Sequence, residues 1–145
     1  MMRLWHFKLL PYLPDKMLIS EWRECIAIKR QWEKGTLKHR LVSYVMNQPD
    51  TEIMSGKQYF ASYVSDVCYE LERRGIKYNP KYFNEIMEFC DPTPYIGANY
   101  EEHNKRYLRQ CYYNLQEKYD RGIVSEEEWR KIDEGIRVIT NNKGI

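Results

Sequence analysis

Apolar residues recur every three or four positions through most of the chain, which predicts an all-α protein. The clearest stretch covers residues 57–74. Its apolar positions fall on one helical face and are Phe60, Tyr63, Val64, Val67, Cys68 and Leu71. Arg73 and Arg74 suit the negative end of this helix, and Gly75 suits the position just beyond it. We expect this helix to form the centre of the core.

A second amphipathic stretch precedes it. Asp15 is a suitable N-cap for a helix that runs to about Gln31. The apolar stripe of this helix is expected to consist of Leu18, Trp22, Cys25 and Ile26. Glu21, Arg23 and Glu24 fall off that stripe, so we expect them on the polar face.

Four more helices are predicted from spacing and capping residues. Leu37, Leu41 and Val45 predict a short helix that ends near residue 47. Asn79 and Pro80 begin a helix over residues 80–90, another spans 100–119, and a Ser125–Glu128 capping box begins the last, over 125–140. Strand patterns and internal repeats are not evident. We therefore predict one compact all-α domain over residues 1–145, with five to six helices. Pro11 and Pro14 keep residues 1–14 from forming one helix, and we expect this N-terminal arm to pack near the first helix.

Composition and charge narrow the class of protein. With 145 residues and 43% hydrophobic residues, the chain can bury a core, and intrinsic disorder is excluded. Residues 1–40 hold nine Lys or Arg against four Asp or Glu, a net charge of +5. Residues 41–145 hold 14 against 17, a net charge of −3. This asymmetry favours a polyanionic partner for the N-terminal part.

The four cysteines, Cys25, Cys68, Cys90 and Cys111, show no spacing typical of a zinc site. We expect them to be buried free thiols in a reducing cytosol, and we expect no metal and no cofactor. No apolar run is long enough to cross a membrane, and Pro11, Pro14 and Asp15 interrupt any signal-peptide core. The prediction is a cytoplasmic protein, for which a nucleoid-associated or viral origin also fits.

Candidate chemistry lies where the arm meets the first helix. If the arm folds back over that helix, the α-amine approaches Glu24. A free amine beside a carboxylate and two arginines, Arg3 and Arg23, suits Schiff-base chemistry on an anionic substrate.

Several segments resemble one known family. They are the early Arg3, the entry to the first helix at Leu13 to Asp15, the run Glu21-Trp22-Arg23-Glu24, and the helix exit from Tyr69 to Lys77. In these the chain resembles the pyrimidine-dimer DNA glycosylase/AP lyase family, that of phage endonuclease V and its uncharacterised bacterial relatives. The resemblance covers roughly the first 115 residues and leaves the helix at 125–140 outside it.

The resemblance implies a compact all-α DNA repair enzyme, expected to be a monomer, that acts on damaged double-stranded DNA. It implies that the N-terminal α-amine, of Met2 or of Met1, attacks the sugar C1′ carbon and that Glu24 assists base release and strand cleavage. Arg3 and Arg23 match DNA-contacting arginines of the family. Further basic residues expected to attract DNA are Lys16, Lys29, Arg30, Lys34, Lys38 and Arg40.

The chain departs from the family pattern at three places. It begins Met1-Met2-Arg3, so the choice of start residue decides which amine is the nucleophile. Met17 and Ala27 stand where the family has a histidine and an arginine, and Lys16 and Lys29 are candidates to replace their charge. The family's aromatic C-terminal segment is not recognisable, and the candidates to replace it are Tyr112, Tyr113, Tyr119 and Trp129.

Two other readings of the residues remain open. One is a non-catalytic nucleic-acid-binding helical module, and the other is a helical protein-interaction protein. In either of them Glu24 is a solvent-facing helix residue. Trp5 and Trp22 are expected in the core, and His103 is expected on the surface.

Overall fold

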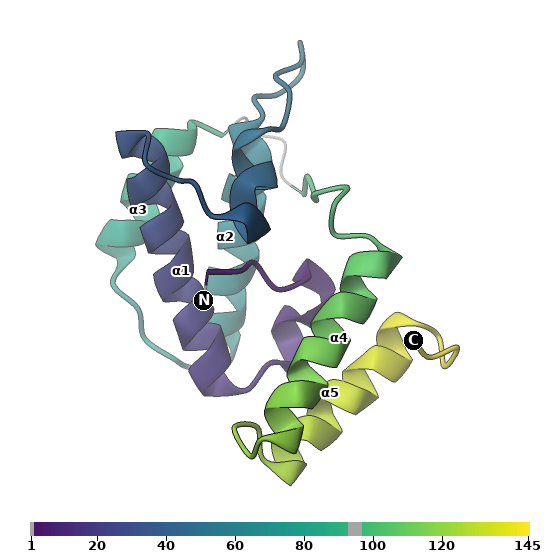
Figure 1. Ribbon diagram of the computed structural model, residues 1–145. Helices are drawn as coiled ribbons and strands as arrows, with labels where there is room; N and C mark the ends of the chain where they lie inside the picture. The colour runs from purple at the N-terminus through teal and green to yellow at the C-terminus, as the bar shows by residue number, and fades with distance from the viewer. Residues whose placement is uncertain (1, 93–96) are drawn as a thin grey trace.

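The computed structural model describes residues 2–92 and 97–145, and these residues form helices and no strand (Figure 1). The α-helices are α1 (Asp15–Lys34), α2 (Lys57–Arg73), α3 (Pro80–Cys90), α4 (Lys105–Asp120) and α5 (Glu126–Ile139). Two 3₁₀ helices are η1 (Phe7–Tyr12) and η2 (Arg40–Met46). The predicted all-α fold is confirmed, and η1, within the N-terminal arm, is the one described helix that was not predicted.

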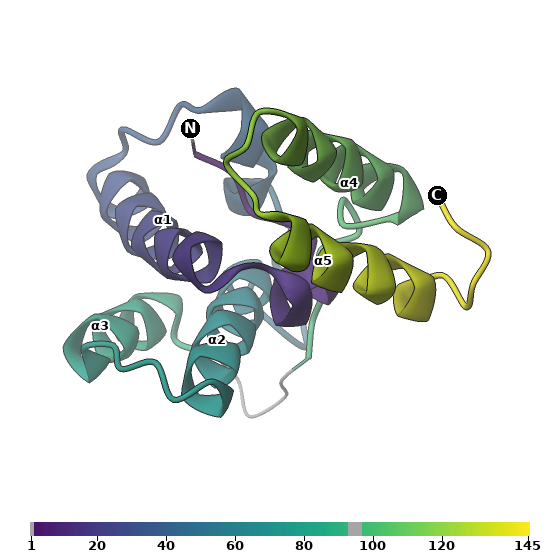
Figure 2. The same cartoon turned by 90° about the horizontal axis from the view of Figure 1, so that it is seen from below.

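The helices form two groups, and the N-terminal arm lies between them. Helices α1, α2 and α3 contact one another, and α4 contacts α5. Helix η1 contacts both α2 and α5 and so joins the groups, as Figures 1 and 2 show. A Cβ atom on Gly135 of α5 would lie 2.3 Å from the Tyr12 ring. Glycine at this position therefore lets η1 approach α5 closely.

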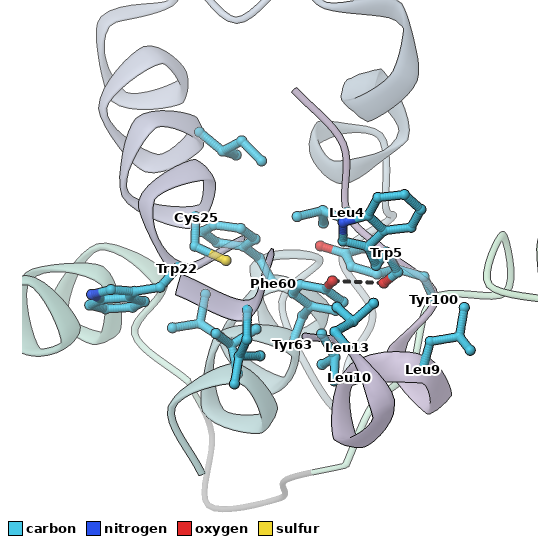
Figure 3. Close-up of a cluster of buried hydrophobic side chains, with 14 of the residues drawn as sticks. Leu4, Trp5, Leu9, Leu10, Leu13, Trp22, Cys25, Phe60, Tyr63 and Tyr100 are labelled. Atoms are coloured by element: carbon cyan, nitrogen blue, oxygen red, sulfur yellow. Dashed lines mark hydrogen bonds between the residues drawn. The ribbon is translucent and has the colours of Figure 1, made fainter. Parts of the chain in front are cut away.

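The core is built on the α2 stripe, as predicted. Phe60, Tyr63, Val64, Val67, Cys68 and Leu71 are all buried. The arm contributes more core than its prolines indicated: Leu4, Leu9, Leu10 and Leu13 are at most 2% exposed. Figure 3 shows arm residues beside Phe60 and Tyr63. Trp5, Trp22 and all four cysteines are buried, as expected.

Helix boundaries follow the capping residues. Gly75 has φ +73°, Asn79 caps α3 with Pro80 at its first position, and the Ser125–Glu128 capping box is formed. Each of these predictions is confirmed.

Three boundary predictions were wrong. Asp15 is the first residue of α1 and not its cap, and α1 continues to Lys34, because Gly35 with φ +71° is the residue that ends it. The helix predicted over 100–119 begins only at Lys105, since Asn104 is its cap. The segment over 37–47 contains a 3₁₀ helix that buries Val42 and Val45 while Leu41 stays exposed. None of the described helices combines the length and the apolar character that a membrane span requires.

Candidate active site

A cavity of about 530 Å³ lies between α1 and α4, beside the N-terminal arm. Its lining residues come from three parts of the chain: Arg3 and Trp5 from the arm; Lys16, Met17, Ser20, Glu21 and Glu24 from α1; and Asn114, Glu117, Lys118, Arg121 and Ile123 from α4 and the turn after it. Figure 2 shows the N-terminus between α1 and α4. The cavity thus brings carboxylates and cations together at the start of the chain.

The arm is extended before η1, so its backbone groups need partners outside regular structure. On the α1 side they find two glutamates. The Arg3 N–H donates to Glu24 Oε2 at 2.8 Å, and the Trp5 N–H donates to Glu21 Oε1 at 3.0 Å. These bonds hold the arm along α1 and confirm that it packs near the first helix.

Side chains from α2, from α4 and from the turn before α4 bind other backbone groups of the arm. The Tyr63 hydroxyl donates to the Trp5 carbonyl at 2.7 Å, the bond drawn in Figure 3, and the Tyr107 hydroxyl donates to the Leu4 carbonyl. His103 Nδ1 accepts the Phe7 N–H at 3.2 Å. The position of the arm is therefore fixed from both sides.

His103 was expected on the surface, and this expectation was wrong: it is 5% exposed. Its Nδ1 accepts a hydrogen bond, so the proton of the neutral ring is on Nε2 and donates to Tyr44 Oη at 2.7 Å. Burial, together with the neighbouring His6, lowers the pKa of His103 to about 3. Burial likewise lowers the pKa of His6 to about 4. Both rings are neutral at physiological pH.

The two glutamates of α1 differ in burial. Glu21 is 1% exposed, so its placement on the polar face was wrong, and Ile28 rather than Ile26 completes the buried stripe. Burial raises the pKa of Glu21 well above its usual range, and the nearby Glu24 carboxylate raises it further. Burial also raises the pKa of Glu24, but the hydrogen bond from the Arg3 N–H opposes this effect. Glu24 is half-buried, and its carboxyl group reaches the cavity.

The pyrimidine dimer DNA glycosylase family model matches residues 2–84, which is more than half of the chain. The chain belongs to this family. No curated protein and no solved structure matches the chain. Membership implies DNA repair of the glycosylase type, with DNA as substrate. The match ends at residue 84, before the limit of about 115 expected for the resemblance, and it contains the arm and α1 through α2.

Of the predicted catalytic residues in this family member, Met2 and Glu24 lie together. Met2 is half-buried and directly precedes Arg3, whose N–H contacts Glu24. Met1 lies outside the described residues. The Arg3 guanidinium stacks over the Trp5 ring at 5.2 Å and lines the cavity, while Arg23 is exposed on α1 and outside the cavity lining.

The other predicted DNA-binding residues separate into two groups. Lys16 lines the cavity, where its ammonium group donates to the Ile123 carbonyl. Lys29 pairs with Glu33 at 3.0 Å and lies over Phe89, and Arg30 lies over the Tyr82 ring at 5.3 Å, so both face α3. Lys34, Lys38 and Arg40 are exposed around the end of α1 and the start of η2.

The charged cavity residues that were not predicted as site residues are Glu21, Glu117, Lys118 and Arg121. Glu21 gave no signal, because an acidic residue in a polar stretch predicts exposure. Lys118 and Arg121 could have been recognised from the sequence, because Asn114, Lys118 and Arg121 recur at spacings of four and three and so share a helical face.

The aromatic residues suggested as replacements for the family's C-terminal segment pack α4 against α5. Tyr119 stacks on Trp129 with ring centroids 5.3 Å apart, and Tyr112 lies 5.2 Å from the same ring. Tyr113 contacts Tyr112 and is 54% exposed. These four aromatic residues do not line the cavity beside Glu24. Within residues 2–92 and 97–145, no group of three or more His, Cys, Asp or Glu could hold a metal ion.

Proposed function

We propose that this protein releases a damaged base from duplex DNA and nicks the strand through an imine formed by its N-terminal α-amine. The observation that supports the proposal best is the hydrogen bond from the Arg3 N–H to Glu24 at 2.8 Å, at the edge of a cavity lined by cations. In a chain that starts at Met2, the amine lies about 3.5 Å from that N–H along the backbone.

The chemistry suits an α-amine. Its ordinary pKa is about 7.7–8.0, whereas that of a lysine is about 10.4, so a larger fraction of the α-amine is neutral and nucleophilic near pH 7. The amine nitrogen bonds to C1′ as the glycosidic C–N bond breaks, and the base leaves with the electron pair. Positive charge develops on the sugar in this step, and the Glu24 carboxylate is placed to stabilise it.

Strand cleavage follows from the same intermediate. The C1′–O4′ bond opens first: O4′ leaves with the electron pair and takes up a proton, and the nitrogen lone pair forms a protonated imine at C1′. This imine acidifies the C2′ hydrogen, and Glu24 removes it as a base. The electron pair forms the C2′–C3′ double bond, and the 3′ phosphate leaves. Water then hydrolyses the imine and returns the free amine.

The cations of the cavity suit the DNA backbone. Arg3 and Lys16 line one wall, and Lys118 and Arg121 line the other, so phosphates on either side of an extruded nucleotide would meet positive charge. Binding through such contacts weakens as salt rises. Because damage weakens stacking and pairing, extrusion of a nucleotide costs least at a lesion.

Borohydride trapping tests the proposal. The substrates are a duplex with one cyclobutane pyrimidine dimer, a duplex with one abasic site and an intact duplex, and the chains begin at Met1 or at Met2. We expect a covalent adduct with damaged DNA only, lost when the N-terminus is acetylated. Glu24→Gln should abolish cleavage and leave DNA binding nearly unchanged. Glu33→Gln, on the same helix but outside the cavity, is the matched control and should cleave normally.

The other outcomes separate the alternatives. Salt-dependent DNA binding with no adduct from either chain would indicate a non-catalytic binding module. An absence of DNA affinity, or affinity independent of salt, would indicate a protein-interaction role. An adduct with the abasic duplex alone would restrict the activity to the lyase step.

A further inference from the structure

Glu21 is a buried carboxyl group without an ion-pair partner among the described residues. It is 1% exposed. The other buried glutamate, Glu70, is ion-paired with Arg73 and Arg74. An unpaired buried carboxylate is costly, so the environment of Glu21 favours its protonated form. The burial of such a group at the wall of the proposed active site calls for a physical explanation.

The hydrogen bonds of Glu21 connect it to the arm. Oε1 accepts the Trp5 N–H at 3.0 Å, and the single proton of the Tyr63 hydroxyl is shared between Oε1, at 2.6 Å, and the Trp5 carbonyl, at 2.7 Å. Glu21 and Tyr63 together therefore hold both polar backbone groups of Trp5. Two residues earlier, the Arg3 N–H meets Glu24.

The spacing of the two carboxyl groups matches the spacing of the two N–H groups. Residues 21 and 24 are neighbours on one helical face. Residues 3 and 5 of an extended segment direct their N–H groups to the same side. The arm therefore runs antiparallel to α1, and the bond at Glu21 sets the register that brings Arg3, and the residue before it, to Glu24.

The two carboxyl groups are neighbours, three residues apart on one face of α1, and each of them affects the pKa of the other. Both hydrogen bonds from the arm and Tyr63 fall on Oε1 of Glu21. A proton on the remaining oxygen would be shared with Glu24. In that arrangement Glu21 is neutral, donates to the Glu24 carboxylate and stabilises its charge.

We infer that Glu21 is a positioning residue that fixes the register of the arm against α1 and sets the pH range in which Glu24 is ionised. The inference rests on the proposed function, in which Glu24 acts as a carboxylate. It assigns Glu21 no contact with DNA.

Other titratable groups around the pair keep one charge state over the working range. They are Cys25 on α1, Tyr63 on α2, Tyr44 on η2 and Cys111 on α4, and burial raises the pKa of each. The charged groups that face the pair across the cavity are Arg3, Lys16, Glu117, Lys118 and Arg121. His6 and His103 change protonation only at the acidic end, because their pKa values are lowered to about 4 and about 3, and the α-amine has an ordinary pKa of about 7.7–8.0. The pair is therefore the group around the arm expected to change protonation between these limits.

Two substitutions separate the roles of Glu21. Glu21→Gln keeps an acceptor for the Trp5 N–H and a donor for Glu24, so it imitates the neutral carboxyl group. Glu21→Leu keeps the volume and removes both. Glu70→Leu removes a buried glutamate outside the cavity lining and is the matched control for a loss of stability alone.

The measurement is the rate of strand cleavage on a duplex with one abasic site, from pH 4 to pH 9, with kcat and KM determined separately. We expect Glu21→Gln to keep the acidic limb of the wild-type profile. Glu21→Leu should lower kcat at least about tenfold, change KM less than about twofold and move the acidic limb up by about one pH unit, because Glu24 loses a donor. Glu70→Leu should lower the melting temperature without moving the limb.

Two results would overturn the inference. A downward shift of the acidic limb in Glu21→Gln would mean that Glu21 carries a charge in the wild type. Glu21→Gln keeps the shape and hydrogen bonds of the native residue, so this result does not depend on a variant that disturbs the fold. A profile of Glu21→Leu equal to that of Glu70→Leu would reduce Glu21 to a structural residue.

Inactivity of the wild type would reject the proposed function and still leave Glu21 testable. The titration of the Glu24 carboxyl carbon, followed by ¹³C NMR in the free protein, does not require activity. Its pKa should be unchanged in Glu21→Gln and higher in Glu21→Leu. Equal pKa values of Glu24 in all three proteins would refute the inference.

Discussion

The two halves of the N-terminal arm are held by different chemistry. Residues 3–7 are held by groups that can gain or lose a proton, among them Glu21, Glu24 and His103. Residues 10–15 are held by one guanidinium group: Arg74 donates to the carbonyls of Leu10, Pro11 and Leu13 and to Asp15, and Glu70 pairs with it. In both halves some backbone groups need side-chain partners, and in the second half these partners are provided by a permanent charge.

The difference indicates which half is structural. An arginine paired with a carboxylate keeps its charge throughout the physiological pH range. The contacts of Arg74 with residues 10–15 therefore do not respond to pH. Around residues 3–7, burial raises the pKa of Glu21 and Glu24 and lowers that of His103. Perturbed groups beside a cavity are typical of functional sites. Four predictions test this contrast, beginning with the largest expected effect.

Arg74→Met should have the largest effect on stability. It leaves three arm carbonyls without the Arg74 donor, and it removes the less exposed of the two arginines that pair with Glu70, whose side chain is 4% exposed. Breaking a buried ion pair in this way costs about 3–5 kcal/mol, which urea unfolding at pH 7 would measure. Arg73→Met is the control, because the Arg73 side chain is 54% exposed. An equal decrease in the free energy of unfolding of both variants would show that Arg74 is not the main residue that holds residues 10–15.

His103→Leu tests the protonatable half. The Phe7 N–H and the Tyr44 hydroxyl lose their partner, so we expect a loss of about 1–3 kcal/mol at pH 7. The acid response should become flatter. A histidine with a folded-state pKa of about 3 and an ordinary pKa of 6.5 loses its stabilising contribution as pH falls from about 6.5 to 3.

Unfolding curves at pH 7, 5 and 4 would measure both effects for His103→Leu. His39→Leu is the control, since His39 is only half-buried and outside the arm contacts. An unchanged slope of stability against pH in His103→Leu would mean that His103 is not the neutral, buried group described above.

Glu21→Gln should respond to pH with the opposite sign. The pKa of Glu21 is raised in the folded state, so folding binds a proton that the unfolded chain releases above its ordinary pKa. The wild type therefore loses stability as pH rises above about 4.5, and the amide variant does not. The stability of Glu21→Gln relative to wild type should increase from pH 4 to pH 8 in melting experiments. A constant difference over this range would contradict the raised pKa.

The sequence predicts most of the fold and only part of the site. Caps and periodicity identified the α2 stripe, the start of α3 and the capping box of α5, because these signals are local. The arm was harder to predict, since its partners lie far along the chain: Phe7 bonds His103, and Trp5 bonds Glu21 and Tyr63. Buried polar groups are recognised only when the backbone that they satisfy is known.

Asp15→Asn should have the smallest effect on stability. It tests how much of the contribution of Arg74 comes from its ion pair with Asp15. Asp15 accepts a hydrogen bond from Arg74 at 2.9 Å, but its side chain is 70% exposed. Exposed pairs of this kind contribute up to about 1 kcal/mol, so we expect a small loss in urea unfolding, reduced further by salt. If the free energy of unfolding fell as much as in Arg74→Met, the Asp15 ion pair would account for the stabilising effect of Arg74. The expected small loss would instead assign the stabilisation of residues 10–15 to the three carbonyl hydrogen bonds and to the buried Glu70.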